Sequence, residues 1–440
     1  MPSSSPRRLT TWAATAMIVT QVIGVGIFLT PASMMRSVGG LAPALLVWLI
    51  VGLLSVAGAL CYAELTTRFP QAGGGYVFLR EAFGSRAAFV FGWISLLVTD
   101  PGITAALAIG FAQYFLAAID APSSFLTATA IATVCVFGVV TLAGRSVSSV
   151  ILRWTAAAKL AIVGLLVVLG VLRAGSAAGS IAAAPDAVPM SMGALAGAVI
   201  AAFFAFGGWW ELGRMSEEVE APRRTMPRAL IGGVAIVTGV YALITIAYTL
   251  GTSGRMAGDS DVAFVADVGR ALFGPTAGRT LAAVVVVAVS GSLAATLLAS
   301  PRMYLAMSRD KLFPGGWLRF DLRRGTAPGA TLIQGGLACV LIALGTFEQI
   351  LGYFIPITIF FLGLSAASLF RLPRPAADDP AFRTPFHPLP LVLFLCLIAV
   401  VLILFAVGRP RETLIGAAIA ILGVPASFIA ERTLGQRASS

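Results

Sequence analysis

The segment Gln21–Pro31, which reads QVIGVGIFLTP, lies in the middle of the first long apolar run of the chain. Its two glycines, Gly24 and Gly26, each lower helix stability by roughly 1 kcal/mol relative to alanine. A helix through this segment is therefore weak at its midpoint. One explanation is close packing, because glycine is common where helices in a membrane touch. The other is an interruption of the helix at that point.

The composition indicates that most of the chain lies in a membrane. Of its 440 residues, 58% are hydrophobic and 11% are charged, and the mean hydropathy is +0.94. A soluble core cannot bury that much apolar surface. The net charge of +11 comes from basic residues in short segments between apolar runs. That distribution does not fit a basic face that binds nucleic acid, so no nucleic-acid partner is expected.

About twelve membrane spans are expected, because each apolar run is near the length that crosses the hydrocarbon layer. They form one transmembrane domain, residues 1–440, with spans at 10–34, 42–67, 87–118, 123–143, 150–173, 193–215, 228–250, 278–308, 330–347, 350–371, 388–407 and 412–431. Basic residues gather after the second, sixth and eighth runs, which predicts a cell-membrane protein with both termini cytoplasmic. Between the second and third runs, Pro70–Gly84 predicts a glycine turn and a short interfacial helix.

No cofactor or metal site is expected from the sequence. The four cysteines each fall inside an apolar run without CxxC spacing, and the one histidine, His387, lies among prolines in a connection. An enzyme embedded in the membrane would need histidine or paired carboxylates at mid-depth. An enzymatic function is therefore not expected.

The sixth run carries a second weak point, Ala205-Phe206-Gly207-Gly208-Trp209. The two weak points occupy corresponding places, since each lies in the first of five successive runs. Matched glycine interruptions in corresponding spans are the best sequence indication of a substrate site at mid-membrane. Together they favour interruption over simple packing.

Interrupted helices expose backbone groups of opposite polarity. The start of the outer half presents N–H groups that bind an anion, and the end of the inner half presents carbonyl groups that bind a cation. An amino-acid zwitterion carries both charges. Its carboxylate is expected on the N–H groups around Val25, Gly26 and Ile27, and its ammonium on the carbonyls of Ile23, Phe204 and Ala205.

Four segments carry a family resemblance: GVGIF at 24–28, YAELTTRFPQAGGGYVFLREAFG at 62–84, FFAFGGWWELGRMSEEVEAPRRTMPRAL at 203–230 and SGSLAATLLASPRMYLAMSRDKLFP at 290–314. In their order and spacing, over about residues 10–371, the chain resembles the amino acid–polyamine–organocation superfamily, most closely its L-amino-acid-transporter-like members. The resemblance implies an all-α, LeuT-like fold. Two inverted five-helix repeats (10–173 and 193–371) and two further helices (388–431) would surround a central site used by alternating access. It also implies that Gly24, Val25 and Gly26 hold the carboxylate and that Phe204 closes over the substrate from outside.

Lys159 lies inside the fifth run and is one of only two lysines in the chain. Placing a lysine at mid-membrane costs about 2.5–3.5 kcal/mol. Either it extends to the cytoplasmic interface, where Arg153 lies less than two turns earlier, or it has a function. The resemblance implies the second reading: in sodium-independent relatives a lysine here approaches the broken first helix, where sodium-coupled members hold an ion.

Two carboxylates are further candidates for coupling. Asp100, deep in the third run, has three possible roles: accepting a proton, contacting the polar end of the substrate, or capping an irregular helix. Glu211, just past the second weak point, is either a proton carrier or part of an ordinary salt bridge. The side walls of the pocket are expected to come from Ser290 and Ser292 in the eighth run, whose hydroxyls can also satisfy freed backbone groups.

The charged run Glu217–Arg224 has two readings as well. Most such runs are solvated faces. The resemblance adds an inner gate in which these charges pair near Arg80 and Glu81.

The expected function is transport of amino acids by a permease or exchanger, with neutral L-amino acids as substrates and no requirement for sodium. The alternative is a cationic amino acid or polyamine antiporter or proton symporter. A channel or a non-transporting sensor of the same fold would share these sequence features. The expected partners are the substrate and the lipid bilayer, and the sequence leaves a homodimer or a partner subunit open.

Overall fold

The structure is a computed structural model that describes residues 9–24, 26–71, 73–142, 155, 159, 161–165, 168, 192–251, 265–266, 269–270, 274–312, 327–375 and 379–436. In this part of the chain the regular structure is helical, apart from one isolated bridge between Leu9 and Val219. The elements are α1 (Thr11–Val22), α2 (Gly26–Val38), α3 (Leu41–Arg68), α4 (Gly75–Phe83), α5 (Ser85–Ile94), η1 (Ser95–Thr99), α6 (Asp100–Ile119), η2 (Ser123–Phe125), α7 (Leu126–Leu142), α9 (Met192–Ala205), η3 (Trp209–Glu218), α10 (Pro222–Gly251), α12 (Pro275–Arg309), α13 (Pro328–Leu344), α14 (Phe347–Arg371), α15 (Leu389–Gly408) and α16 (Pro410–Gln436).

Nine of the described helical segments are long and apolar enough to cross a membrane. They match nine of the predicted spans. Of the other three, 10–34 is split into α1 and α2, 330–347 is the shorter apolar helix α13, and 150–173 lies mostly outside the described residues. The chain is an all-α, multi-pass membrane protein, while the count of twelve and the division into two repeats stay predictions.

Several helices begin earlier than the apolar runs indicate. α10 begins at Pro222 rather than at residue 228, and α12 begins at Pro275 rather than at 278. Proline is favoured in the first helical turn, because an N–H there would have no hydrogen-bond partner within the helix and because the φ of proline already suits the helix. The proline positions therefore mark these starts better than hydropathy does.

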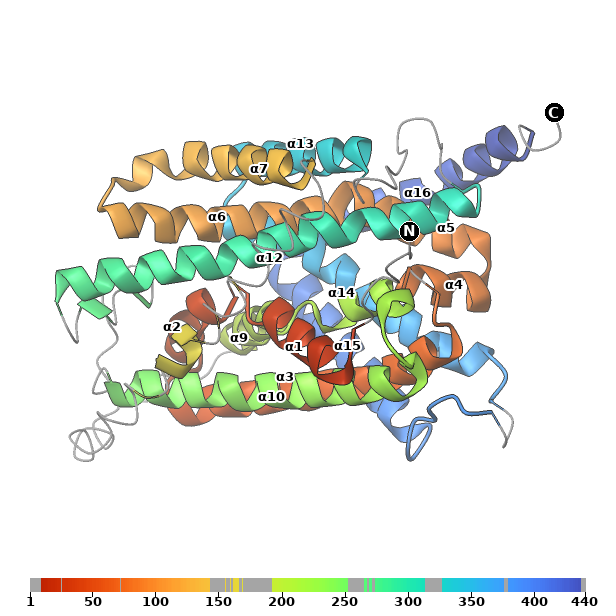
Figure 1. Ribbon diagram of the computed structural model, residues 1–440, viewed down its shortest axis with the longest axis horizontal. Coiled ribbons are helices and arrows are strands. Elements are labelled where there is room, and N and C mark those ends of the chain that lie inside the picture. Colours follow the sequence, from red (N-terminus) through yellow and green to blue (C-terminus); the bar gives the residue numbers. More distant parts are fainter. Residues whose placement is uncertain are drawn as a thin grey trace, which may run out of the picture.

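The interrupted helices lie inside the molecule, between long unbroken ones. Figure 1 shows α3 and α10 side by side along one edge and α7 and α13 along the opposite edge, with α6 and α12 packed lengthwise between them. The short helices α1, α2 and α9 lie between α12 and the α3–α10 pair (Figure 1). On the outer helices α15 and α16, large apolar side chains such as Leu393, Ile403 and Leu422 are more than half exposed. Such surfaces suit contact with lipid.

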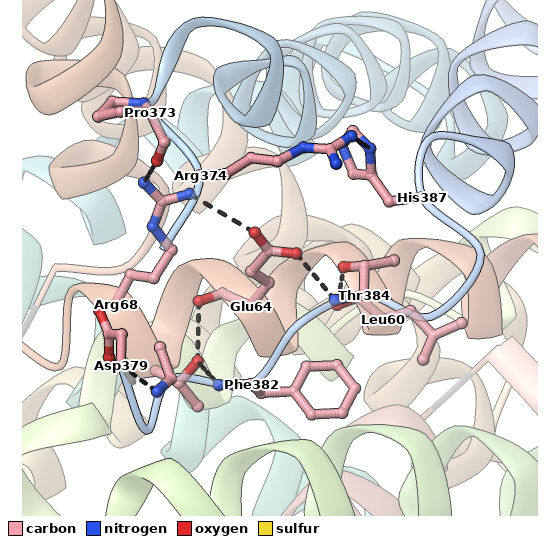
Figure 2. Close-up of polar contacts among 11 residues, drawn as sticks. Leu60, Glu64, Arg68, Pro373, Arg374, Asp379, Phe382, Thr384 and His387 are labelled. Carbon is pink, nitrogen blue, oxygen red and sulfur yellow. Dashed lines mark hydrogen bonds and ion pairs between the residues drawn. The ribbon is translucent and has the colours of Figure 1, made fainter. Parts of the chain in front are cut away.

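The connection between α14 and α15 is fixed over the end of α3 by a buried carboxylate (Figure 2). Glu64, 5% exposed, accepts a hydrogen bond from the Thr384 N–H at 2.9 Å and pairs with Arg68 at 3.5 Å. The Thr67 hydroxyl accepts a second backbone hydrogen bond, from Phe382, at 3.1 Å. Because a buried carboxylate needs partners, these contacts hold the connection in one place.

Candidate functional site

The first membrane span is interrupted near its middle. α1 ends at Val22, and Ile23 and Gly24 leave helical geometry before α2 begins at Gly26. The carbonyl groups at the end of α1 have no partner in their own helix. The Val22 oxygen accepts from the Gly24 N–H at 2.6 Å, and the hydroxyl of Tyr241 on α10 lies 2.8 Å from the same oxygen.

The second interruption falls where the sequence predicts it. α9 ends at Ala205, and the chain turns through Gly207 and Gly208 before η3, a 3-10 helix, begins at Trp209. Gly208 has φ +112°, a conformation that residues with a Cβ rarely adopt. The Tyr241 hydroxyl is also 2.8 Å from the Ala205 oxygen, so one tyrosine contacts a freed carbonyl at each interruption.

The two interruptions cross at close range. A Cβ on Gly26 would lie 2.6 Å from Cα of Ala205, which is well inside van der Waals contact. A Cβ on Gly208 would lie 3.0 Å from Cγ of Gln21. Glycine is therefore required for the approach of α2 to α9 as well as for the turn.

A cavity of about 90 Å³ lies at this crossing. Its walls combine both interruptions with aromatic, hydroxyl and charged side chains. They include Gly24, Gly26, Gly207 and Gly208; Phe203, Phe204, Trp210 and Phe354; Ser292, Thr296, Ser300 and Thr358; and Asp100, Glu211 and Arg214. Apolar and aromatic walls with a few polar and charged groups among them are the lining typical of a small-molecule site.

Seven residues that the sequence proposes for binding or coupling line this cavity: Gly24, Gly26, Asp100, Phe204, Gly207, Glu211 and Ser292. Five other proposed residues, all described, do not line it: Ile23, Ile27, Ala205, Phe206 and Ser290. Phe206 instead packs against Trp48 and Tyr241, and the Ser290 hydroxyl donates to the Val286 carbonyl of its own helix. Val25 lies outside the described residues.

Lys159 is held against the first interrupted helix. Its side chain is 1% exposed, and Nζ donates to the Thr20 carbonyl and to the Ser292 hydroxyl, each at 2.6 Å. Ser292 lines the cavity, so the ammonium touches both the end of α1 and a wall of the cavity. In the structure Lys159 does not extend to the interface.

Asp100 and Glu211 meet through a residue that sequence reasoning missed. The guanidinium of Arg214 lies between them, 3.6 Å from Asp100 and 3.1 Å from Glu211, and Tyr304 donates to the second oxygen of Asp100. Asp100 follows a π-helical turn, Ser95–Thr99, a feature frequent at functional sites. The signal for Arg214 was its spacing, because it stands three residues after Glu211 on one face of η3.

Among the described residues no three His, Cys, Asp or Glu side chains gather closely enough to hold a metal ion.

An aromatic cluster lies between the wall of this cavity and the wall of a larger one. Phe204 packs edge-on against Phe354, which lines the cavity, and against Phe347, which lines a second space of about 780 Å³. That second space is bordered by α2, α6, α9 and α14 on the side away from α4. The rings of Phe204, Phe347 and Phe354 thus run from the wall of one space to the wall of the other.

At the end of the molecule where α4 lies, ion pairs join neighbouring elements to α12. Glu217 and Glu218 pair with Arg309 and Arg302 of α12, and pairing of this charged run near Arg80 and Glu81 stays a prediction. Arg80 and Tyr76 of α4 both contact Asp310, at the end of α12. Burial and the hydrogen bond to Asp310 raise the pKa of Tyr76, so its hydroxyl keeps its proton and donates.

Comparison with known proteins identifies the family of the chain. The model of a family described as amino acid permease matches residues 9–425. The cystine/glutamate transporter of Homo sapiens is 29% identical over 436 residues, which cover 96% of this chain and 85% of that protein. The b(0,+)-type amino acid transporter 1 of Oryctolagus cuniculus is 30% identical over 372 residues, 83% of this chain and 76% of that protein. The large neutral amino acids transporter small subunit 2 of Mus musculus is 27% identical over 430 residues, 95% and 80% respectively. The chain is a membrane transporter of amino acids rather than an enzyme, and it belongs to the amino acid permease family.

Proposed function

We propose that this permease moves neutral L-amino acids by alternating access and without sodium, from the cavity at the two helix interruptions. The observation that supports the proposal is the close approach of the two helix interruptions. Gly24 and Gly26 of one interruption and Gly207 and Gly208 of the other border a single small cavity. Freed N–H groups there suit a carboxylate and freed carbonyls suit an ammonium.

The remaining walls support a neutral side chain of modest size. Phe203, Phe204 and Phe354 offer apolar surface, and the space of about 90 Å³ has room for only a few non-hydrogen atoms beyond the zwitterion. The charged residues of the cavity are already paired with one another. A cationic side chain would therefore have to compete with Arg214 for its carboxylates.

Lys159 supports independence from sodium. Its ammonium contacts the end of α1 and the wall at Ser292, a place where a bound cation would otherwise balance the freed carbonyls. We assign the end with α4 to the cytoplasm, because the basic residues Arg80, Arg302 and Arg309 gather there. In this orientation the 780 Å³ space is the outer vestibule, and Phe204 is the lid between it and the substrate.

The test is uptake of labelled amino acids into proteoliposomes that contain the purified protein. Uptake should be saturable, should prefer neutral L-amino acids and should not change when choline replaces sodium. Stimulation by internal amino acid would establish exchange. A steep dependence on sodium would refute the role given to Lys159, and non-saturable flux would favour a channel.

A further inference from the structure

Arg214 ties the inner half of the sixth span to two other helices beside the cavity. Its Nη1 is 3.6 Å from Oδ1 of Asp100 on α6, and Tyr304 of α12 donates to the other oxygen of Asp100. Its Nε is 3.1 Å from Oε2 of Glu211, which belongs to η3 itself. The side chains of Arg214, Asp100 and Glu211 are 7%, 2% and 11% exposed, so this is an ionic contact almost out of water.

The position of the cluster suits a closure on the α4 side of the cavity. Four residues of α12, Ser292, Thr296, Ser300 and Tyr304, follow one another at intervals of four and therefore share one helix face. The first three line the cavity, and the fourth holds Asp100. The cavity wall thus continues along α12 to the cluster, and the ion pairs at the end of α12 lie beyond the cluster.

The two carboxylate partners of Arg214 lie on different elements, so a movement of η3 affects the two contacts differently. Glu211 stands three residues away on the same element, so it travels with Arg214. Asp100 stays on α6, where it keeps Tyr304 of α12. An uncompensated buried charge is strongly destabilising. Here the contact between Arg214 and Asp100 is able to open without leaving either charge alone.

We propose that the Arg214–Asp100 ion pair is the inner closure of the transport cavity, with Glu211 and Tyr304 as the partners that hold the two charges when it opens. This rests on the alternating access proposed above. Closed, the pair keeps η3 against α6 and α12 and seals the cavity from the α4 side. Open, the guanidinium remains with Glu211, the carboxylate remains with Tyr304, and Ser300 becomes accessible. Arg214 is thus a positioning residue that acts through Asp100.

The proposal predicts opposite effects from two substitutions that each remove one carboxylate. Asp100→Asn removes the charge that pairs with Arg214 and keeps an amide oxygen that can accept from Tyr304, so the open arrangement should gain population. Glu211→Gln removes the partner that travels with the guanidinium, which then depends on Asp100, so the open arrangement should lose population. A cluster that served only stability would respond to both changes in the same direction.

The experiment measures access to the cavity from the α4 side. Ser300→Cys is introduced after Cys61, Cys135, Cys339 and Cys396 have been replaced, and a membrane-impermeant thiol reagent is added to that face of proteoliposomes. Asp100→Asn should raise the labelling rate by about tenfold or more, the fold-change that corresponds to losing one hydrogen bond to a charged group. Glu211→Gln should lower the rate by a similar factor.

A control comes from the exposed pair of Arg309 and Glu217, which joins η3 to α12 at 3.8 Å with side chains about half exposed. Arg309→Gln should change the rate by less than about fivefold, because exposed ion pairs contribute little. If Asp100→Asn does not yield folded protein, Tyr304→Phe replaces it and should lower the rate, since Asp100 then has no partner to hold it when the closure opens.

Unchanged labelling in Asp100→Asn, a shift of the same sign in Glu211→Gln, or an unchanged rate in Tyr304→Phe would overturn the proposal. Amino acid uptake by the parent protein is measured in parallel. Normal uptake with unaffected labelling would refute the closure and leave the transport function standing. Opposite shifts in labelling without uptake of any amino acid would support the closure and refute the substrate assignment.

Discussion

Gly26→Ala should damage substrate binding more than any other single methyl group added at the interruptions. The new Cβ would lie 2.6 Å from Cα and 3.0 Å from Cβ of Ala205. Carbon atoms pack at about 3.5–4.0 Å, so α2 and α9 would have to separate by about 1 Å. Neither atom of Ala205 belongs to a flexible side chain that can turn away.

The expected magnitude follows from the cost of overpacking. One methyl group forced into a packed site costs about 1–3 kcal/mol. If only the substrate-bound state, in which α2 and α9 touch, bears this cost, substrate binding weakens by about 5- to 150-fold. The helix propensity that alanine adds, at most about 1 kcal/mol, offsets only part of this. At Gly24 the same methyl would lie 3.5 Å from the Ser292 hydroxyl, an ordinary contact, so Gly24→Ala should fold normally.

The assay is binding of labelled substrate to purified protein, together with the melting temperature. Gly239→Ala on α10, which faces open space, is the control and should leave both unchanged. Wild-type affinity in Gly26→Ala would refute the close crossing of the two interruptions. Lost stability without lost affinity would place the strain outside the site.

Three further substitutions test other parts of the account. Lys159→Ala should keep the protein monodisperse and abolish or uncouple uptake, and arginine should not restore it, because the guanidinium fits a different geometry; wild-type uptake would limit Lys159 to a structural role. Tyr241→Phe should lower stability by about 1–3 kcal/mol, since it removes the hydroxyl that contacts the Ala205 carbonyl and the Val22 carbonyl, of which the second also accepts from the Gly24 N–H; an unchanged melting temperature would show that the Ala205 carbonyl finds another partner. Glu64→Gln should speed hydrogen exchange at the amides of the connection between α14 and α15, and unchanged exchange would show that the carboxylate does not fix it.

Local sequence chemistry anticipates the backbone of the site better than its side chains. Gly24, Gly26, Gly207 and Gly208 mark both interruptions, because glycine in the middle of an apolar helix is costly without a reason. Hydropathy likewise predicts the long spans. The proline-led helix starts at Pro222 and Pro275 were missed, because hydropathy reports burial in lipid rather than helix propensity.

Contacts between distant helices could not be read from the chain. Nothing in the sequence around Tyr241, on α10, indicates that its hydroxyl contacts the Val22 and Ala205 carbonyls. Arg214 stands three residues before the charged run Glu217–Arg224, and nothing in its own stretch of sequence shows that it lies between two buried carboxylates. Both depend on how helices separated in sequence pack together, which periodicity within one helix does not encode.

The central claim is that the backbone at the two interruptions binds both charged ends of an amino acid. The most direct test is competition for binding between a neutral amino acid, the amine formed by its decarboxylation and the acid formed by its deamination. Only the intact amino acid should compete well, because each product lacks one of the two charges. An amine that competes as well as its parent would contradict the account and favour a polyamine-type site.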